Sequence, residues 1–205
     1  MYENFKYLDA VAQREITKGV FSGSVLSVIH KGETVYLKSF GLADKEKNIP
    51  MKTDSIFRLF SMSKPVTAAA AMILIERGLL DTRHPLKWFI PEFSDPVVLD
   101  ENGERSADRD ITIGDLLTMT SGIPYPDSTP AGQKMGALWG EQSEKYLKGE
   151  KLLDTVSFAK EMGKRPLMFT PGEKWMYGAS ADIMGAVIEV VSGMKFGDFL
   201  RKEIF

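Results

Sequence analysis

Cysteine is absent from this 205-residue chain, and histidine nearly so. Without cysteine there is no disulfide framework, no thiolate metal site and no thiol nucleophile. The two histidines, His30 and His84, fall in no ligand-like cluster, so the sequence predicts neither a metal site nor a cofactor. A surplus of charge is missing too. The 26 basic and 28 acidic side chains nearly cancel, which excludes a long-range field that would attract nucleic acid.

Long hydrophobic runs and an export signal are also lacking. The most apolar stretch, residues 68–75, is too short to cross about 30 Å of hydrocarbon. The first residues, MYENFKYLDAV, do not follow the basic, then apolar, then small-residue order of a signal peptide. We therefore expect no membrane insertion, a cytoplasmic location and a small-molecule partner. The apolar content of 43% suffices for a sizeable core.

Hydrophobic spacing predicts the order of the secondary-structure elements. Apolar residues at three- and four-residue steps over 2–18 indicate an amphipathic helix, and the β-rich runs 24–30 and 33–40 indicate an antiparallel hairpin. The run 61–78 is apolar nearly all round in its middle and ends at a glycine, as a buried helix does. The sequence also predicts a helix at 113–118 behind the N-cap Thr112, a long surface excursion at 123–150, and helices at 153–162, 180–192 and 196–204.

This order predicts an α/β fold, in which an antiparallel sheet is flanked by helices and followed by a mostly helical subdomain. Residues 1–80 would form the N-terminal part of the α/β domain, and residues 81–205 the helical subdomain. A two-stranded sheet leaves an unpaired edge and an uncovered face. We therefore expect the natural protein to continue beyond this sequence, with the remaining sheet strands and a C-terminal helix absent from this chain.

Ser61 and Lys64 stand three residues apart in FRLFSMSKP, at the start of the expected buried helix, so both side chains share one face. Unpaired backbone N–H groups and the positive end of the helix dipole would stabilise an oxyanion formed at Ser61. Burial against an apolar helix would lower the pKa of Lys64, by up to about 3–5 units, and only the neutral amine can accept a proton from Ser61. The alternative is that Ser61 caps the helix and Lys64 is solvated.

Tyr177 lies in the run FTPGEKWMYGAS, a Pro-Gly loop just ahead of an apolar helix. Such a loop can present the phenol to a cleft, and a tyrosine beside a cationic lysine can pass a proton between nucleophile and leaving group. The alternative is a core aromatic side chain.

Three segments in this order, FRLFSMSKPVTA, DLLTMTSGIP and PGEKWMYGASADIMGAVIEVVSG, resemble the serine β-lactamase and penicillin-binding-protein superfamily. The similarity is to its branch of class C β-lactamases and family VIII carboxylesterases. It implies a β-lactamase-like fold, incomplete in this chain, and a hydrolase that acts through an acyl-enzyme. By this resemblance Ser61 is the nucleophile, Lys64 the base and Tyr177 the second proton-transfer residue.

Two departures from the family pattern bear on the activity. Ala179 stands where the lactamases carry the asparagine of Tyr-x-Asn, and a methyl group cannot make that hydrogen bond, so a carboxylesterase is favoured over a β-lactamase or a D-alanyl-D-alanine peptidase. A Lys-Thr-Gly or His-x-Gly motif beyond the tyrosine is missing, and with it the second oxyanion donor. The loss of one such donor costs about 2.7–4 kcal/mol, so we expect the isolated fragment to be nearly inactive.

The remaining expectations concern substrate and partners. Tyr125 and Trp175, together with Ala179, are the candidate substrate-binding residues, although Trp175 also fits a core position. The expected partners are a small ester or lactam, and either the C-terminal remainder of the protein or a second copy of the chain. An α/β-hydrolase nucleophile elbow at residues 178–182 fails, because Asp182 replaces the last glycine of GxSxG. A non-catalytic binding or sensing module on the same scaffold stays open.

Overall fold

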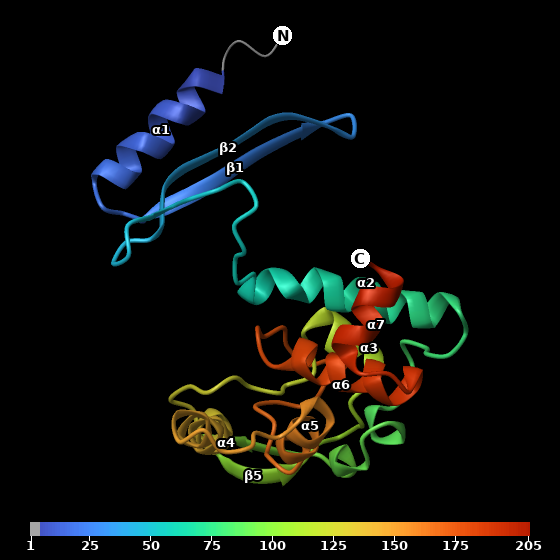
Figure 1. Cartoon of the computed structure of the whole chain (residues 1–205). Helices are drawn as coiled ribbons and strands as arrows, with labels where there is room; N and C mark the ends of the chain where they lie inside the picture. The colour runs from blue at the N-terminus through green and yellow to red at the C-terminus, as the bar shows by residue number, and fades with distance from the viewer. Residues whose placement is uncertain (1–4) are drawn as a thin grey trace. The chain divides into compact units, whose positions relative to one another are not determined.

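The computed structural model describes residues 5–205, which form two compact units, and each is described by itself (Figure 1). The units divide between Leu59 and Phe60. The sequence placed a boundary later, after residue 80. The difference arises because helix α2 (Ser63–Glu76) packs against α6 (Ser180–Ser192) and α7 (Phe196–Glu203) and so belongs to the helical unit.

The first unit is a helix on a small antiparallel sheet. Helix α1 (Lys6–Thr17) precedes β1 (Gly23–His30), β2 (Glu33–Asp44) and β3 (Ile49–Pro50), which pair in that order. Residues 2–4 of the expected helix lie outside the described residues. The hairpin between β1 and β2 is confirmed. Both of its turn residues, at 31 and 32, have positive φ, the backbone of a type I′ turn. The short β3 was not predicted.

Tyr36 fixes α1 to the sheet. Its side chain is buried, its ring lies 5.0 Å from the ring of Phe5, and its hydroxyl donates to Asp9 of α1. The ammonium of Lys38 lies 2.6 Å from the other oxygen of Asp9. The helix therefore covers one face of β2.

In the second unit, helix α6 is the centre of the core. It packs against α2, α3, α5 and α7, and these helices lie around it in Figure 1. Ile183, Ala186 and Val187 are fully buried, and α2 contributes Ala70 and Ala71 to the same core. The sequence predicted burial of α2 on most sides, but only one face is buried, and Met72 on the other side is 51% exposed. The other helices of the unit are α3 (Ile113–Thr118), α4 (Pro130–Leu147) and α5 (Thr155–Gly163).

Helix α4 corrects the sequence analysis, which expected a surface excursion at 123–150. Thr129 is its N-cap, and the side chain accepts a hydrogen bond from the backbone of Gly132. Pro130 occupies the first helical position, where its missing N–H costs nothing. Met135 and Leu138 of one face are buried. The three glycines of this helix lower helix propensity and obscured its periodicity.

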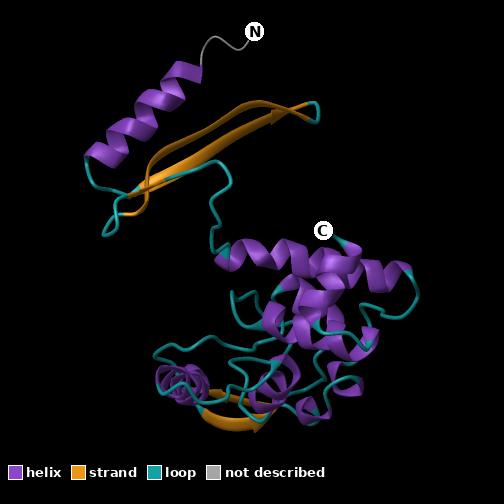
Figure 2. Ribbon diagram, viewed as in Figure 1, coloured by secondary structure: helices purple, strands orange, loops and turns teal. Residues whose placement is uncertain are grey.

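The sequence also missed a second hairpin, β4 (Val97–Asp100) with β5 (Gly103–Ser106), which packs beside α4 (Figure 2). Four-residue strands are too short to show a clear alternation. Two 3₁₀ turns, Leu86–Trp88 and Pro91–Phe93, precede this hairpin. Within residues 5–205, no helix combines the length and the apolar character needed to cross a membrane.

Candidate active site

Ser61 lies in a 3₁₀ turn, Phe60–Met62, that leads into helix α2. The helix begins at Ser63 and its N-cap, Met62, makes no side-chain capping bond, so Ser61 does not cap it. Phe60 has a φ of 48°, a left-handed conformation that costs a residue with a side chain roughly 1–2 kcal/mol. Backbone strain of this kind concentrates at functional sites.

The structure brings Ser61, Lys64 and Tyr177 together. The ammonium of Lys64 donates to Ser61 Oγ at 3.2 Å. The hydroxyl of Tyr177, 116 residues further along the chain, donates to the same oxygen at 2.5 Å. Lys64 lies in the first turn of α2, and Tyr177 lies in the loop before α6. The three side chains therefore meet where the N-termini of these two helices come close together.

A second tyrosine lies beside the same lysine. The Lys64 nitrogen lies 4.7 Å from the ring centroid of Tyr177 and 5.5 Å from that of Tyr125. The two ring centroids are 6.0 Å apart. The hydroxyl of Tyr125 donates to Asp182 Oδ2 at 2.7 Å. Tyr125 thus lies close to the group. Sequence reasoning missed Asp182, since no local signal joins two residues that are 57 positions apart.

The pKa of Lys64 is shifted in the direction opposite to the one expected from the sequence. Burial lowers the pKa of Lys64, but hydrogen bonding to Tyr177 and Tyr125 outweighs it, and the net pKa lies above the ordinary value. The expected depression was therefore wrong in direction, because the lysine is only partly buried and faces two phenols. Hydrogen bonding with Lys64, and then with Ser61, lowers the pKa of Tyr177. Burial, together with the bond to Asp182, raises the pKa of Tyr125 to about 12.

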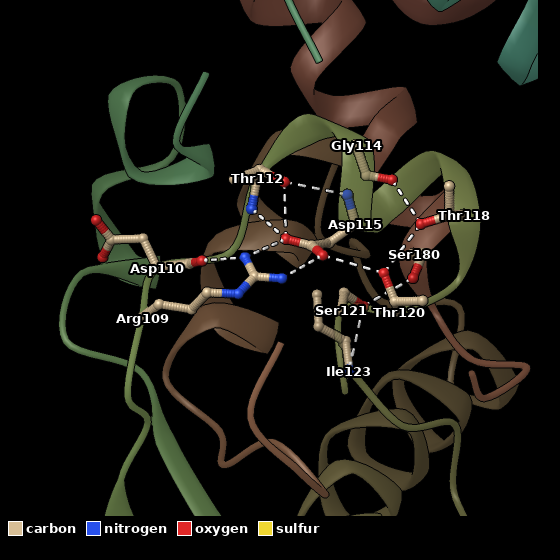
Figure 3. A network of polar contacts seen from close by, with 10 residues as sticks. All are labelled: Arg109, Asp110, Thr112, Gly114, Asp115, Thr118, Thr120, Ser121, Ile123 and Ser180. Atoms are coloured by element: carbon tan, nitrogen blue, oxygen red, sulfur yellow. Dashed lines mark hydrogen bonds and ion pairs between the residues drawn. The ribbon is translucent and has the colours of Figure 1, made fainter. Parts of the chain in front are cut away.

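A network of polar contacts is centred on Asp115, at the start of α3 (Figure 3). The guanidinium of Arg109 donates hydrogen bonds to both carboxylate oxygens of Asp115, at 2.8 and 2.7 Å. Thr112 and Asp115 form the capping box at the start of α3, and Thr120 donates to Asp115 at 3.0 Å. Burial alone would raise the pKa of Asp115, but these bonds hold it below its ordinary value.

Backbone pairing connects this network to Tyr177. The carbonyl of Thr120 accepts from the amide of Gly172 at 2.8 Å, and the carbonyl of Met119 accepts from that of Met176 at 2.9 Å. The hydroxyls of Ser121 and Ser180, both buried, lie 2.8 Å apart. The loop that carries Tyr177 is therefore held along the segment 119–123.

We expect Asp115→Asn to lower the free energy of unfolding by about 1–3 kcal/mol, because Arg109 and the start of α3 lose their charged partner. The side chain of Asp115 is 7% exposed and that of Arg109 is 42%, so part of the effect is screened. Urea unfolding at pH 7 measures it. A group with a depressed folded-state pKa stabilises above its unfolded pKa, about 3.9 for aspartate, so the difference should fade as the pH drops below that value.

The matched control for this variant is Asp198→Asn, which removes an aspartate that is 61% exposed and paired with Arg201. Its effect should stay within about 0.5 kcal/mol. Equal losses in the two variants would show that the network contributes no more than a surface ion pair.

Other candidate residues lie apart from the group. Ala179 is fully buried and donates its backbone N–H to the carbonyl of Ile123 at 3.2 Å, so its methyl group packs in the core. Trp175 is 68% exposed, which is contrary to a core role. His84 packs its ring against Trp88, 5.1 Å away, outside the group around Ser61.

A cavity of about 390 Å³ opens beside Lys64 and Asp182. Phe158, Met162 and Phe196 line it with apolar surface. Its size and lining are those of a small-molecule pocket, which is mostly apolar with a few polar groups.

The fold is that of the serine β-lactamases and penicillin-binding-protein-like enzymes. The sequence model of the β-lactamase family matches residues 8–205, and the chain belongs to this family. The resemblance stated from the motifs is thereby confirmed, as is the α/β fold class.

Three relatives illustrate the range of the family. Esterase EstB of Burkholderia gladioli is 34% identical over 91% of this chain and 45% of its own length. Penicillin-binding protein 4* of Bacillus subtilis is 31% identical over 98% of this chain and 39% of its own length. The solved structure of EstCE1, a hydrolase with promiscuous acyltransferase activity, superposes with a TM-score of 0.80 at 28% identity, over 97% of this chain and 50% of that one. The chain thus spans half or less of the length of these relatives.

Proposed function

We propose that this chain carries the nucleophile of a serine hydrolase that acts through an acyl-enzyme on small carboxylic esters. The observation that carries the proposal is the double hydrogen bond at Ser61 Oγ, from Lys64 at 3.2 Å and from Tyr177 at 2.5 Å. A nucleophile within hydrogen-bond reach of a base that a further group orients is the signature of nucleophilic catalysis.

In the proposed mechanism Tyr177, rather than Lys64, takes the proton. The raised pKa of Lys64 keeps its ammonium charged. The lowered pKa of Tyr177 increases the fraction of its hydroxyl that is ionised at a given pH. The phenolate accepts the proton of Ser61 as Oγ bonds to the ester carbonyl carbon. It then passes this proton to the leaving alkoxide as the carbon–oxygen bond breaks. Water repeats the sequence and releases the acid.

Lys64 acts as a cation in this scheme. Its ammonium, between the two tyrosine rings, stabilises the phenolate and the negative charge that develops near Ser61. The backbone N–H of Ser61 is the proposed oxyanion donor from this chain.

Two observations support an ester rather than a lactam as substrate. Ala179 stands where the lactamases carry the asparagine of the Tyr-x-Asn motif, and its side chain is fully buried. The cavity beside Lys64 exposes more apolar than polar surface, and the side chains of Phe158, Met162 and Phe196 in its lining suit an apolar acyl or alcohol group. Similarity to penicillin-binding protein 4* favours a β-lactamase or D-alanyl-D-alanine peptidase as the second candidate. Faster acylation by a cephalosporin than by a p-nitrophenyl ester would decide for this candidate.

Covalent labelling tests the proposal, because formation of an adduct requires an activated serine but no turnover. A fluorophosphonate probe is expected to modify Ser61, as located by peptide mass spectrometry, because a missing second oxyanion donor slows acylation by about 10²–10³-fold without abolishing it. Labelling should vanish in Ser61→Ala and fall at least about tenfold in Lys64→Ala. Ser63→Ala, which changes an exposed serine at the start of α2, is the control and should label normally. A chain that stays unlabelled, or a rate unchanged in Lys64→Ala, would indicate a non-catalytic binding module instead.

A further inference from the structure

The Lys64 nitrogen lies 4.7 Å from the ring centroid of Tyr177 and 5.5 Å from that of Tyr125, and a phenol of either tyrosine has the chemistry to exchange a proton with a serine. Their partners differ. Tyr177 directs its hydroxyl to Ser61 Oγ, whereas Tyr125 directs its own to Asp182 Oδ2 at 2.7 Å. The two phenols differ in their acceptors, because only Tyr125 donates its hydroxyl proton to a carboxylate, that of Asp182.

We propose that Asp182 is a positioning residue that holds the hydroxyl proton of Tyr125 and keeps this phenol turned away from Ser61, so that Tyr177 alone exchanges a proton with the nucleophile. The inference rests on the proposed function. It adds a residue that touches none of the reacting atoms and lies in the lining of the cavity beside Lys64.

The position of Asp182 suits this task. It stands in the first turn of α6, where a negative charge is favoured by the helix dipole, and its backbone N–H donates to the carbonyl of Ala179 at 3.1 Å. The next residue, Ile183, is fully buried. The carboxylate therefore projects from a rigid element of the core toward Tyr125.

The surrounding charges are consistent with one phenol being held protonated. Lys64 of α2 faces both tyrosines, and Asp154, the N-cap of α5, lines the same cavity with its carboxylate 3.5 Å from the ammonium of Lys195. A second phenolate beside Asp182 would place two negative charges within hydrogen-bond distance, which is disfavoured. The raised pKa of Tyr125 and the lowered pKa of Tyr177 agree with this division, because the charge of Asp182 has only a minor raising effect on the pKa of Tyr177, which hydrogen bonding with Lys64 and Ser61 outweighs.

Tyrosine titration tests the inference without any need for activity. In the full chain labelled with ¹³Cζ-tyrosine, Tyr125→Phe and Tyr177→Phe assign the signals of these two residues among those of the six tyrosines. We expect Tyr125 to titrate near pH 12 in the wild type. In Asp182→Asn its midpoint should fall by about one unit or more, because the hydrogen bond to a charged acceptor is lost. Asp182→Glu keeps the charge and should hold the midpoint closer to the wild type. Asp198→Asn is the matched control and should leave it unchanged.

Acylation of Ser61 provides the second measurement. In Asp182→Asn the freed hydroxyl of Tyr125 competes for Lys64 and Ser61, so the rate of fluorophosphonate labelling at pH 8 should fall about three- to tenfold. In a Tyr125→Phe background the same change should add little, because the competing phenol is gone. An Asp182→Asn effect of equal size in both backgrounds would overturn the inference.

The two readouts separate this inference from the function on which it rests. A Tyr125 midpoint that does not move in Asp182→Asn overturns the inference whether or not Ser61 reacts. An unlabelled wild-type chain overturns the proposed function, and with it the role of Asp182 in selecting the base.

Discussion

Replacing Tyr177 with phenylalanine is expected to lower the rate of Ser61 acylation by about 10²–10⁴-fold, the usual contribution of a positioned general base. The substitution removes only the hydroxyl that bonds to Ser61 Oγ and leaves a ring of the same shape beside Lys64. Lys64, with a pKa above its ordinary value, stays charged and does not take over the proton. Intact-mass measurement of the fluorophosphonate adduct against time gives the rate.

The pH dependence of this rate identifies the base. Because the ionised phenol is the reactive form, the wild-type rate should rise with pH and level off once the folded-state pKa of Tyr177, which lies below the ordinary value of about 10, is passed. Lys64→Met removes the main cause of that low pKa and should move the midpoint upward. An identical profile in Tyr177→Phe, or an unmoved midpoint in Lys64→Met, would assign the proton transfer to another group.

The sequence predicted those parts of the fold that local signals determine. Helix α3 follows the N-cap Thr112, and α6 is a mostly apolar run that ends at Gly193, so both were located from a few residues each. The hairpin of the first unit was located from its turn. Helix α4 was missed, because its glycines obscured the apolar spacing even though Thr129 and Pro130 mark its start.

The candidate site divides in the same way. Ser61, Lys64 and Tyr177 stand in motifs, so the sequence identified all three, and the structure places them within hydrogen-bond reach. The pKa of Lys64 depends on which side chains surround it in space, and its direction could not be read from the apolar helix that follows. The pairing of Asp182 with Tyr125 joins the first turn of α6 to a loop 57 positions earlier in the sequence, and no motif marks it.

Replacing Gly178, the residue after Tyr177, is also expected to slow the acylation of Ser61 strongly. At Gly178 a Cβ atom would lie 2.1 Å from the carbonyl oxygen of Ile123, a backbone atom that cannot easily move. Gly178→Ala should therefore push the loop of Tyr177 away from the segment 119–123. A displacement of about 1 Å at a catalytic group costs on the order of 10²-fold in rate, so we expect acylation of Ser61 to fall by about that factor.

Overpacking also destabilises the fold, by about 1–3 kcal/mol, and unfolding has to be separated from misplacement of the phenol. A domain stable by about 5–15 kcal/mol stays folded after such a loss, so labelling at low temperature reports on the site alone. Gly140→Ala is the matched control: its Cβ meets nothing within 4 Å, and alanine stabilises a helix interior by about 0.8–1 kcal/mol over glycine. Gly178→Ala with a wild-type rate would show that the contact with Ile123 does not position Tyr177.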